Sequence, residues 1–345
     1  MKKLFVFAAS AMMVFASCTN NEVVYDNETP QEIGLFSVVN NMTRAAIDGT
    51  SFTHENMAVA AYLAKGSATA GNYFGKTLFE GSGENYTGGQ YWPIQTTTLN
   101  FLAVAPEIED QVVSAFDTTA PASKVEVEVT DNQIYQNDVM YAVAQGTRTV
   151  NAEVSSVGMV FKHALAWVNF AFKKGENTDD ATITINSITL NGATYDGSLT
   201  VTLEDFNSVE AIDSDDASFE WDFADIEPVE SITVPNSSTS SLTLGDTQFD
   251  TYGDGLLVAP TTTAASDFII NYTITANGNS HIYEYTYDAK VDGTPANATY
   301  TDAAKLIWTA GKKYTYNITM SFQEIQISPS VESWGTSVDT PVDIN

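Results

Sequence analysis

The feature that most constrains the fold is a repeated alternation of apolar and polar residues around short turn sequences. In DFIINYTITANGNSHIYEYTYDAKV, residues 267–291, two alternating runs flank Asn277-Gly278-Asn279. A period of two places every second side chain on one face of a strand, and Asn-Gly favours the two-residue turns of hairpins. The segment therefore predicts an antiparallel β-hairpin.

The same signals recur along the chain. KVEVEVT, residues 124–130, alternates strictly through Val125, Val127 and Val129, which predicts a half-buried strand. Further turn pairs stand at residues 48–49, 191–192, 196–197, 254–255 and 292–293. No segment beyond the amino terminus keeps a helical apolar period over three turns, and strands do not alternate with helices. These patterns predict an all-β chain of antiparallel β-sandwiches.

The 345 residues suffice for two domains, each with its own core. The polar stretch AQGTRTVNAEVSSVG, residues 144–158, separates two strand-like regions. We therefore expect a signal at residues 1–18, a propeptide at 19–44, an N-terminal sandwich at 45–150 and a C-terminal sandwich at 151–345.

The amino terminus has the pattern of an export signal. Lys2 and Lys3 precede an apolar run, Leu4 to Phe15, that is too short to span a bilayer. Small residues then lead to Cys18, the only cysteine, at the place where a bacterial lipoprotein carries its lipid. We favour a lipidated Cys18 over an ordinary secretory signal. Either way, no disulfide is expected.

The charge excludes one class of partner. The chain has 14 basic and 44 acidic residues, a formal charge of −30. Such a charge repels nucleic acid and anionic membrane surfaces, so we expect no nucleic-acid binding. It suits an exported protein that must stay soluble.

No motif indicates catalysis, a metal or a cofactor. His54, His163 and His281 lie far apart in the sequence, and His163 stands in an apolar strand where a buried imidazole, hydrogen-bonded to a backbone carbonyl, is expected. There is no nucleophile elbow and no phosphate-binding glycine loop. The acidic segments 177–182 and 211–223 lack calcium-loop spacing, which favours solvated loops. We expect a protein that is not an enzyme.

A sugar-binding platform is one interpretation of the tryptophans, but their positions favour packing. Trp167 lies in an apolar strand, and Trp92, Trp308 and Trp334 lie beside strand signals. Core or interface packing is the preferred interpretation.

Several segments in a fixed order resemble a known family. They are TRAAIDGTSF at 43–52, YWPIQTTTLNFLAVAP at 91–106, NDVMYA at 137–142, VFKHALAWVNFAF at 160–172, IWTAGKKYTYNITM at 307–320 and SPSVESWG at 328–335. Together with the signal, they make the chain similar to the fimbrillins, or Mfa-like pilins, the subunits of type V pili of Bacteroidales. The fold expected is then two Greek-key, transthyretin-like β-sandwiches.

The resemblance implies a route of assembly. Such a precursor reaches the outer membrane as a lipoprotein, and an arginine-specific protease removes the lipid anchor together with a leading β-strand. A terminal strand of another pilin subunit then fills the groove. Here the cut would separate Arg44, one of two arginines, from Ala45. The leading strand would comprise Ile33, Leu35, Phe36, Val38 and Val39, whose apolar residues on both parities predict burial of both faces.

The carboxyl-terminal tail GTSVDTPVDIN, residues 335–345, is the simplest donor strand. Val338, Val342 and Ile344 share one parity with Thr340, which predicts an inward row of three apolar residues and one hydroxyl. The leading strand offers a similar row, with Ser37 as its hydroxyl. The alternative is a frayed chain end.

Two other functions remain open from the sequence. The protein could keep its anchor at the cell surface and bind a host protein or a glycan, as a tip adhesin does. A secreted hydrolase on a β-sandwich is less supported. The family marks do not distinguish stalk, anchor and tip subunits of a fimbrium.

Overall fold

The structure is a computed structural model. It describes residues 30–38, 56–64, 71–82, 85–107, 123–129, 138–150, 152, 156–178, 180–192, 197–203, 205–222, 231–236, 241–253, 255–260, 267–288, 303, 305–322 and 325–333. The elements with bounds in these residues are β-strands, and Ala303 is the one described residue in α-helical conformation, so the all-β prediction is confirmed. Within the same ranges, no helix is long and apolar enough to cross a membrane.

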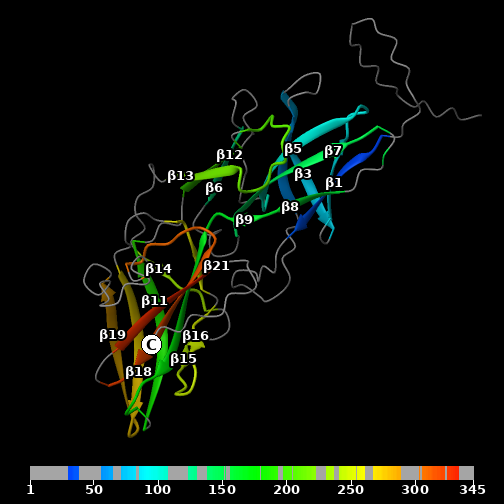
Figure 1. The fold of residues 1–345 in the computed structure, drawn as a ribbon. Helices are drawn as coiled ribbons and strands as arrows, with labels where there is room; N and C mark the ends of the chain where they lie inside the picture. The colour runs from blue at the N-terminus through cyan, green and yellow to red at the C-terminus, as the bar shows by residue number, and fades with distance from the viewer. Residues whose placement is uncertain are drawn as a thin grey trace, which may run out of the picture.

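One large sheet organises the N-terminal half. Its strands are β1 Glu32–Val38, β2 Asn56–Leu63, β3 Gly71–Ser82, β4 Asn85–Tyr91, β5 Thr97–Ala105, β7 Met140–Arg148, β8 Val157–Val160 and β9 Lys162–His163. They follow the order β8-β1-β4-β3-β2-β5-β7-β9, with all neighbours antiparallel except β1 and β8. Figure 1 shows this sheet in one lobe of the molecule.

The large sheet closes on itself. Residues 157–160 pair with β1 at one end of the strand order, and residues 162–163 pair with β7 at the other. The two ends of the sheet are thus joined through one short stretch of chain. The enclosed face carries a buried core that includes Ile33, Leu35, Phe79 and Phe101.

The outer face of β2, β5 and β7 packs against a second, smaller sheet. That sheet has the order β13-β12-β6, with β6 at Ser123–Val129, β12 at Gly197–Leu203 and β13 at Ala217–Asp222. Leu199, Val201 and Leu203 of β12 share a buried cluster with Tyr62 and Leu102. This layer explains why β5 is buried on both faces over most of its length.

Strand pairing crosses the boundary predicted between residues 150 and 151. β8 and β9 follow that point in the chain but complete the large sheet. β12, still later, pairs along its length with β6. The chain therefore returns to its N-terminal half after it has begun the C-terminal one at β10, Ala166–Lys174.

The C-terminal half contains two five-stranded sheets. The first holds β10, β16 Asp250–Thr251, β17 Leu256–Val258, β20 Lys312–Met320 and β21 Ile325–Ser333; the second holds β11 Ala181–Asn191, β14 Ile232–Thr233, β15 Leu242–Thr243, β18 Asp267–Ala276 and β19 Asn279–Asp288. β10 and β20 run parallel, although all other pairs in these two sheets are antiparallel. β18 and β19 form the predicted hairpin, with positive φ angles at Asn277 and Gly278.

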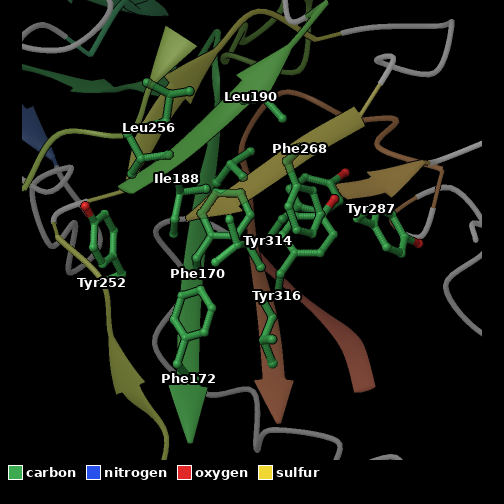
Figure 2. Packing of buried hydrophobic residues seen from close by; sticks show 14 of the residues in the cluster. Phe170, Phe172, Ile188, Leu190, Tyr252, Leu256, Phe268, Tyr287, Tyr314 and Tyr316 are labelled. Carbon is green, nitrogen blue, oxygen red and sulfur yellow. The ribbon is translucent and has the colours of Figure 1, made fainter. Parts of the chain in front are cut away.

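Aromatic rings fill the core of the C-terminal half (Figure 2). Phe170 lies 5.1 Å from Phe268 and 5.4 Å from Tyr316, measured between ring centroids. The Tyr316 hydroxyl accepts a hydrogen bond from Trp308 Nε1 at 3.1 Å and donates to the Ala303 carbonyl at 2.7 Å. Both aromatic residues are thus buried with their polar atoms paired, as stable burial requires.

Candidate functional site

The leading strand β1 lies between β4 and β8 in the closed sheet. It pairs antiparallel with β4, where Gly34 is opposite Thr87 and Leu35 is opposite Tyr86. It pairs parallel with β8, where Leu35 is opposite Val157. Backbone groups on both edges of β1 are therefore engaged, and its removal would leave a one-strand gap between β4 and β8.

One face of β1 belongs to the enclosed core. Ile33 and Leu35 are 0 % exposed and Ser37 is 9 % exposed. Phe36, on the other face, is only partly buried. Burial of both faces, as predicted, therefore holds only in part. Val38 ends the strand, whereas Val39 lies outside the described residues.

Hydrogen bonds hold both ends of β1. At its start, Trp92 N donates to the Gln31 carbonyl at 2.9 Å and Gly89 N donates to Glu32 Oε1 at 3.1 Å. Near its end, the side chain of Ser37 forms a hydrogen bond with Tyr86, which is 1 % exposed. Burial raises the pKa of Tyr86, and the hydrogen bond with Ser37 opposes that rise.

A closely packed group beside β1, called the wall below, consists of Trp92, Gly146 and Val157. The Trp92 ring is 3 % exposed and meets Phe101 edge-on at a centroid distance of 5.9 Å. A Cβ atom at Gly146 would lie 2.6 Å from Val157 Cγ2 and 2.8 Å from Trp92 Cη2, so only glycine fits there without a shift of its neighbours. The predicted core packing of Trp92 is confirmed, as it is for Trp167 and Trp308.

The second arginine has a structural role in this wall. Arg148, at the end of β7, is 2 % exposed. Its Nη1 donates to the carbonyls of Pro93 at 2.9 Å and Trp92 at 3.3 Å. A buried guanidinium paired in this way is shielded from a protease that recognises arginine.

A buried acid and base lie elsewhere in the fold. His163 Nδ1 in β9 lies 2.5 Å from Asp138 Oδ2, just before β7. Burial raises the pKa of Asp138, and the nearby imidazole opposes the rise. The predicted burial of His163 is confirmed, but its partner is the Asp138 carboxylate and not the backbone carbonyl that was expected. His281 is exposed in β19, and His54 lies outside the described residues.

No metal site is evident in the described ranges. They contain no group of three or more His, Cys, Asp or Glu side chains placed to hold an ion. In the acidic segment 211–222, Asp215 pairs with Lys162, which lowers the pKa of that carboxyl. Backbone amides of this segment bond the carboxylates of Asp213 and Asp216, as in a solvated loop.

The sequence predicted the strand β1 but not the residues around it. As predicted, Ile33, Leu35, Phe36 and Val38 lie in a strand. The other site residues predicted from the sequence lie outside the described residues: Cys18, Val39, Arg44, Ala45, Val338, Val342 and Ile344. Tyr86, Gly146 and Val157 were missed because their role depends on long-range pairing, for which a single sequence gives no signal.

Comparison with known proteins agrees with this architecture. A family model described as fimbrillin-like matches residues 43–334. No curated protein sequence matches the chain. A fimbrial protein from Bacteroides vulgatus ATCC 8482 is similar in structure, with a TM-score of 0.56 and 15 % identity over 88 % of this chain and 99 % of that one.

Two further solved structures have lower TM-scores. A putative cell adhesion protein from Bacteroides uniformis ATCC 8492 has a TM-score of 0.44 and 19 % identity, covering 88 % of this chain and 98 % of its own. The tip fimbrial protein Mfa3 from Porphyromonas gingivalis has a TM-score of 0.42 and 11 % identity, covering 89 % and 100 %. Because the family model spans most of the sequence, the chain belongs to the fimbrillin-like family.

Proposed function

We propose that the protein is a structural subunit of a cell-surface type V pilus. It is exported as an outer-membrane lipoprotein through Cys18, cut between Arg44 and Ala45, and polymerised by donation of a β-strand between subunits. The observation that carries this proposal is the position of β1. It fills a place between two strands, yet it precedes the proposed cut in the chain.

The loss of β1 would destabilise the large sheet until another strand took its place. Burial of Ile33 and Leu35 contributes about 3–6 kcal/mol. Without β1, this apolar surface and the facing backbone groups of β4 and β8 would be open to water. A donated strand satisfies both, which is the physical basis of strand addition to a sheet.

The strong negative charge does not prevent assembly. Residues 1–44 carry four acidic and three basic side chains, so the cut changes the formal charge from −30 to −29. Repulsion between exposed charges is screened within about 8 Å at physiological salt. Burial of a strand therefore outweighs it.

The first test is cleavage of the purified full-length precursor by an arginine-specific protease. We expect one cut, because Arg148 is buried, and a product that starts at Ala45. Oligomers in regular steps should follow. Arg44→Ala is the control and should remain intact and monomeric. A cut product that stays monomeric would contradict the proposed role.

The second test concerns the donor. Deletion of residues 337–345 should leave folding and cleavage unchanged but stop polymer growth, because the segment lies beyond β21, the last described strand. Unchanged oligomer ladders would remove the tail from the mechanism.

A role in adhesion is the second candidate, and exposed residues of β19 favour it. Tyr283 is 43 % exposed and stacks on the partly buried Tyr272 of β18 at 5.5 Å between ring centroids, and Ile282, on the opposite face of β19, is 78 % exposed. Exposed aromatic and aliphatic side chains of this kind suit contact with a glycan or a host protein. Glycan-array binding by the uncut protein that is lost in Tyr283→Ala would support it, and unchanged binding would not.

A further inference from the structure

A strand that fills the place of β1 needs three inward-facing side chains of particular kinds, in a fixed order. The positions of Ile33 and Leu35 are 0 % exposed and call for apolar side chains. The position of Ser37 is also buried, but its hydroxyl bonds the side chain of buried Tyr86. Along β1 the inward pattern is therefore apolar, apolar, hydroxyl.

The requirement for a hydroxyl at the Ser37 position is as specific as the requirement for apolar side chains at the positions of Ile33 and Leu35. Tyr86 belongs to the enclosed core, and departure of β1 removes the hydrogen bond that Ser37 supplies. Leaving the buried Tyr86 hydroxyl without this hydrogen bond costs free energy, and a strand that restores the bond avoids that cost. A replacement strand should therefore carry a hydroxyl at the place of Ser37.

The tail meets this pattern in one way only. Its even positions read Thr336, Val338, Thr340, Val342 and Ile344 in chain order, and its odd positions hold no aliphatic residue other than Pro341. Read forward, no three successive even positions give apolar, apolar, hydroxyl. Read backward, Ile344, Val342 and Thr340 give it. This match puts Ile344 at the place of Ile33, Val342 at that of Leu35 and Thr340 at that of Ser37.

Two further positions bear on this arrangement. Pro341 falls at the half-exposed place of Phe36, where its missing N–H leaves one ladder hydrogen bond of this doubly paired strand unmade. Asp343 falls at the place of Gly34, where a Cβ atom would lie 2.8 Å from Ser156 Oγ. That contact is with the end of a side chain that can rotate, and a carboxylate can accept a hydrogen bond from the hydroxyl.

We propose that the tail of a second copy enters the vacant place of β1 with reversed polarity, and that Thr340 fixes its register against Tyr86. The donated strand then runs parallel to β4 and antiparallel to β8, the opposite of β1. This inference rests on the strand replacement proposed above. It adds the direction of the donor, and with it the end of the slot at which the neighbouring subunit stands.

Disulfide cross-linking tests the polarity. Thr87 is exposed and opposite Gly34, and the cut removes Cys18, so introduced cysteines are the only thiols in the mature chain. With Thr340 at the Ser37 position, Asp343 faces Thr87 in the reversed strand, whereas Ser337 faces it in a forward one. Full-length precursors carrying T87C with D343C, or T87C with S337C, are cut, assembled and oxidised.

We expect covalent ladders from the T87C/D343C protein and only background from T87C/S337C. The opposite result overturns the polarity, and equal cross-linking of both pairs overturns a single direction. If polymers form but neither pair cross-links, the register is wrong. If the cut protein without introduced cysteines does not polymerise at all, strand replacement itself fails, which separates the two proposals.

Substitution of the hydroxyl tests the register independently. Thr340→Val keeps the shape but removes the hydroxyl, so its polymers should dissociate about tenfold faster. Thr340→Ser should behave as the wild type, and Tyr86→Phe combined with Thr340→Val should recover durable polymers, because neither partner then needs the bond. Each precursor is first checked for wild-type melting and cleavage. Thr340→Val polymers as durable as the wild type would overturn the pairing.

Discussion

His163 Nδ1 lies 2.5 Å from Asp138 Oδ2, and the two residues are 4 % and 8 % exposed. The pair joins β9 to the start of β7, where the large sheet closes. Asp138 Oδ1 has no hydrogen-bond partner in the part of the chain that the structure describes. The carboxylate therefore depends on the imidazole for its stability in the buried site.

Truncation of His163 should destabilise the protein strongly. His163→Ala leaves Asp138 buried without its base, which costs about 3–5 kcal/mol. Urea unfolding followed by tryptophan fluorescence measures the loss. His281→Ala, at an exposed position of β19, is the matched control and should change stability by about 0.5 kcal/mol or less.

Asn in place of Asp138 should change how stability depends on pH. Burial raises the pKa of Asp138 above its ordinary value of 3.8, so the folded state holds this proton to a higher pH than the unfolded state. The favourable contribution of the protonated group is present below pH 3.8 and is lost as the pH rises through the raised value. The wild type should therefore lose stability relative to Asp138→Asn over that rise, as measured by unfolding at a series of pH values. A parallel pair of curves would contradict the assignment.

Removal of the Tyr316 hydroxyl should weaken the C-terminal core. Tyr316→Phe leaves Trp308 Nε1 and the Ala303 carbonyl without this partner, at a cost of about 1–3 kcal/mol. Thermal unfolding of the variant gives the loss. Tyr283→Phe removes the same atom from a residue that is 43 % exposed and should be near neutral. Equal effects of the two variants would argue against the buried hydrogen bonds as the cause.

A methyl group at Gly146 should disturb the wall beside β1. Gly146→Ala drives a Cβ atom into Val157 and Trp92, and such overpacking costs about 1–3 kcal/mol. Gly75→Ala, in β3, is the control because nothing lies within 4 Å of its added Cβ. Denaturant midpoints of the two variants compare directly. If Gly146→Ala were as stable as Gly75→Ala, the close contact would be relieved by a small shift of the strands.

The sequence predicted features that depend on neighbouring residues. The β18–β19 hairpin is local, and its turn and alternation lie within 25 residues of sequence at 267–291. The pairing of β1 with β8 joins Leu35 to Val157, and the pairing of β6 with β12 joins Val125 to Val201. No periodicity encodes such partners, which depend on the packing of the whole sheet.

Within the site, too, only features that depend on neighbouring residues could be predicted from the sequence. The apolar residues of β1 indicated a strand, but they could not show that Phe36 would be only partly covered. Coverage depends on what packs above a strand, which belongs to another part of the chain. The Asp138–His163 pair was missed for a related reason, since it forms only when β9 closes the sheet against β7.

The two-sided pairing of β1 has a mechanical consequence. Hydrogen bonds in a sheet lie across the strand axis, so a pull along the strand loads both rows together instead of opening them one bond at a time. A strand at a free edge would share the load over one row. The position between β4 and β8 is therefore suited to bear tension, and a strand that replaced β1 there would act as a load-bearing joint between subunits.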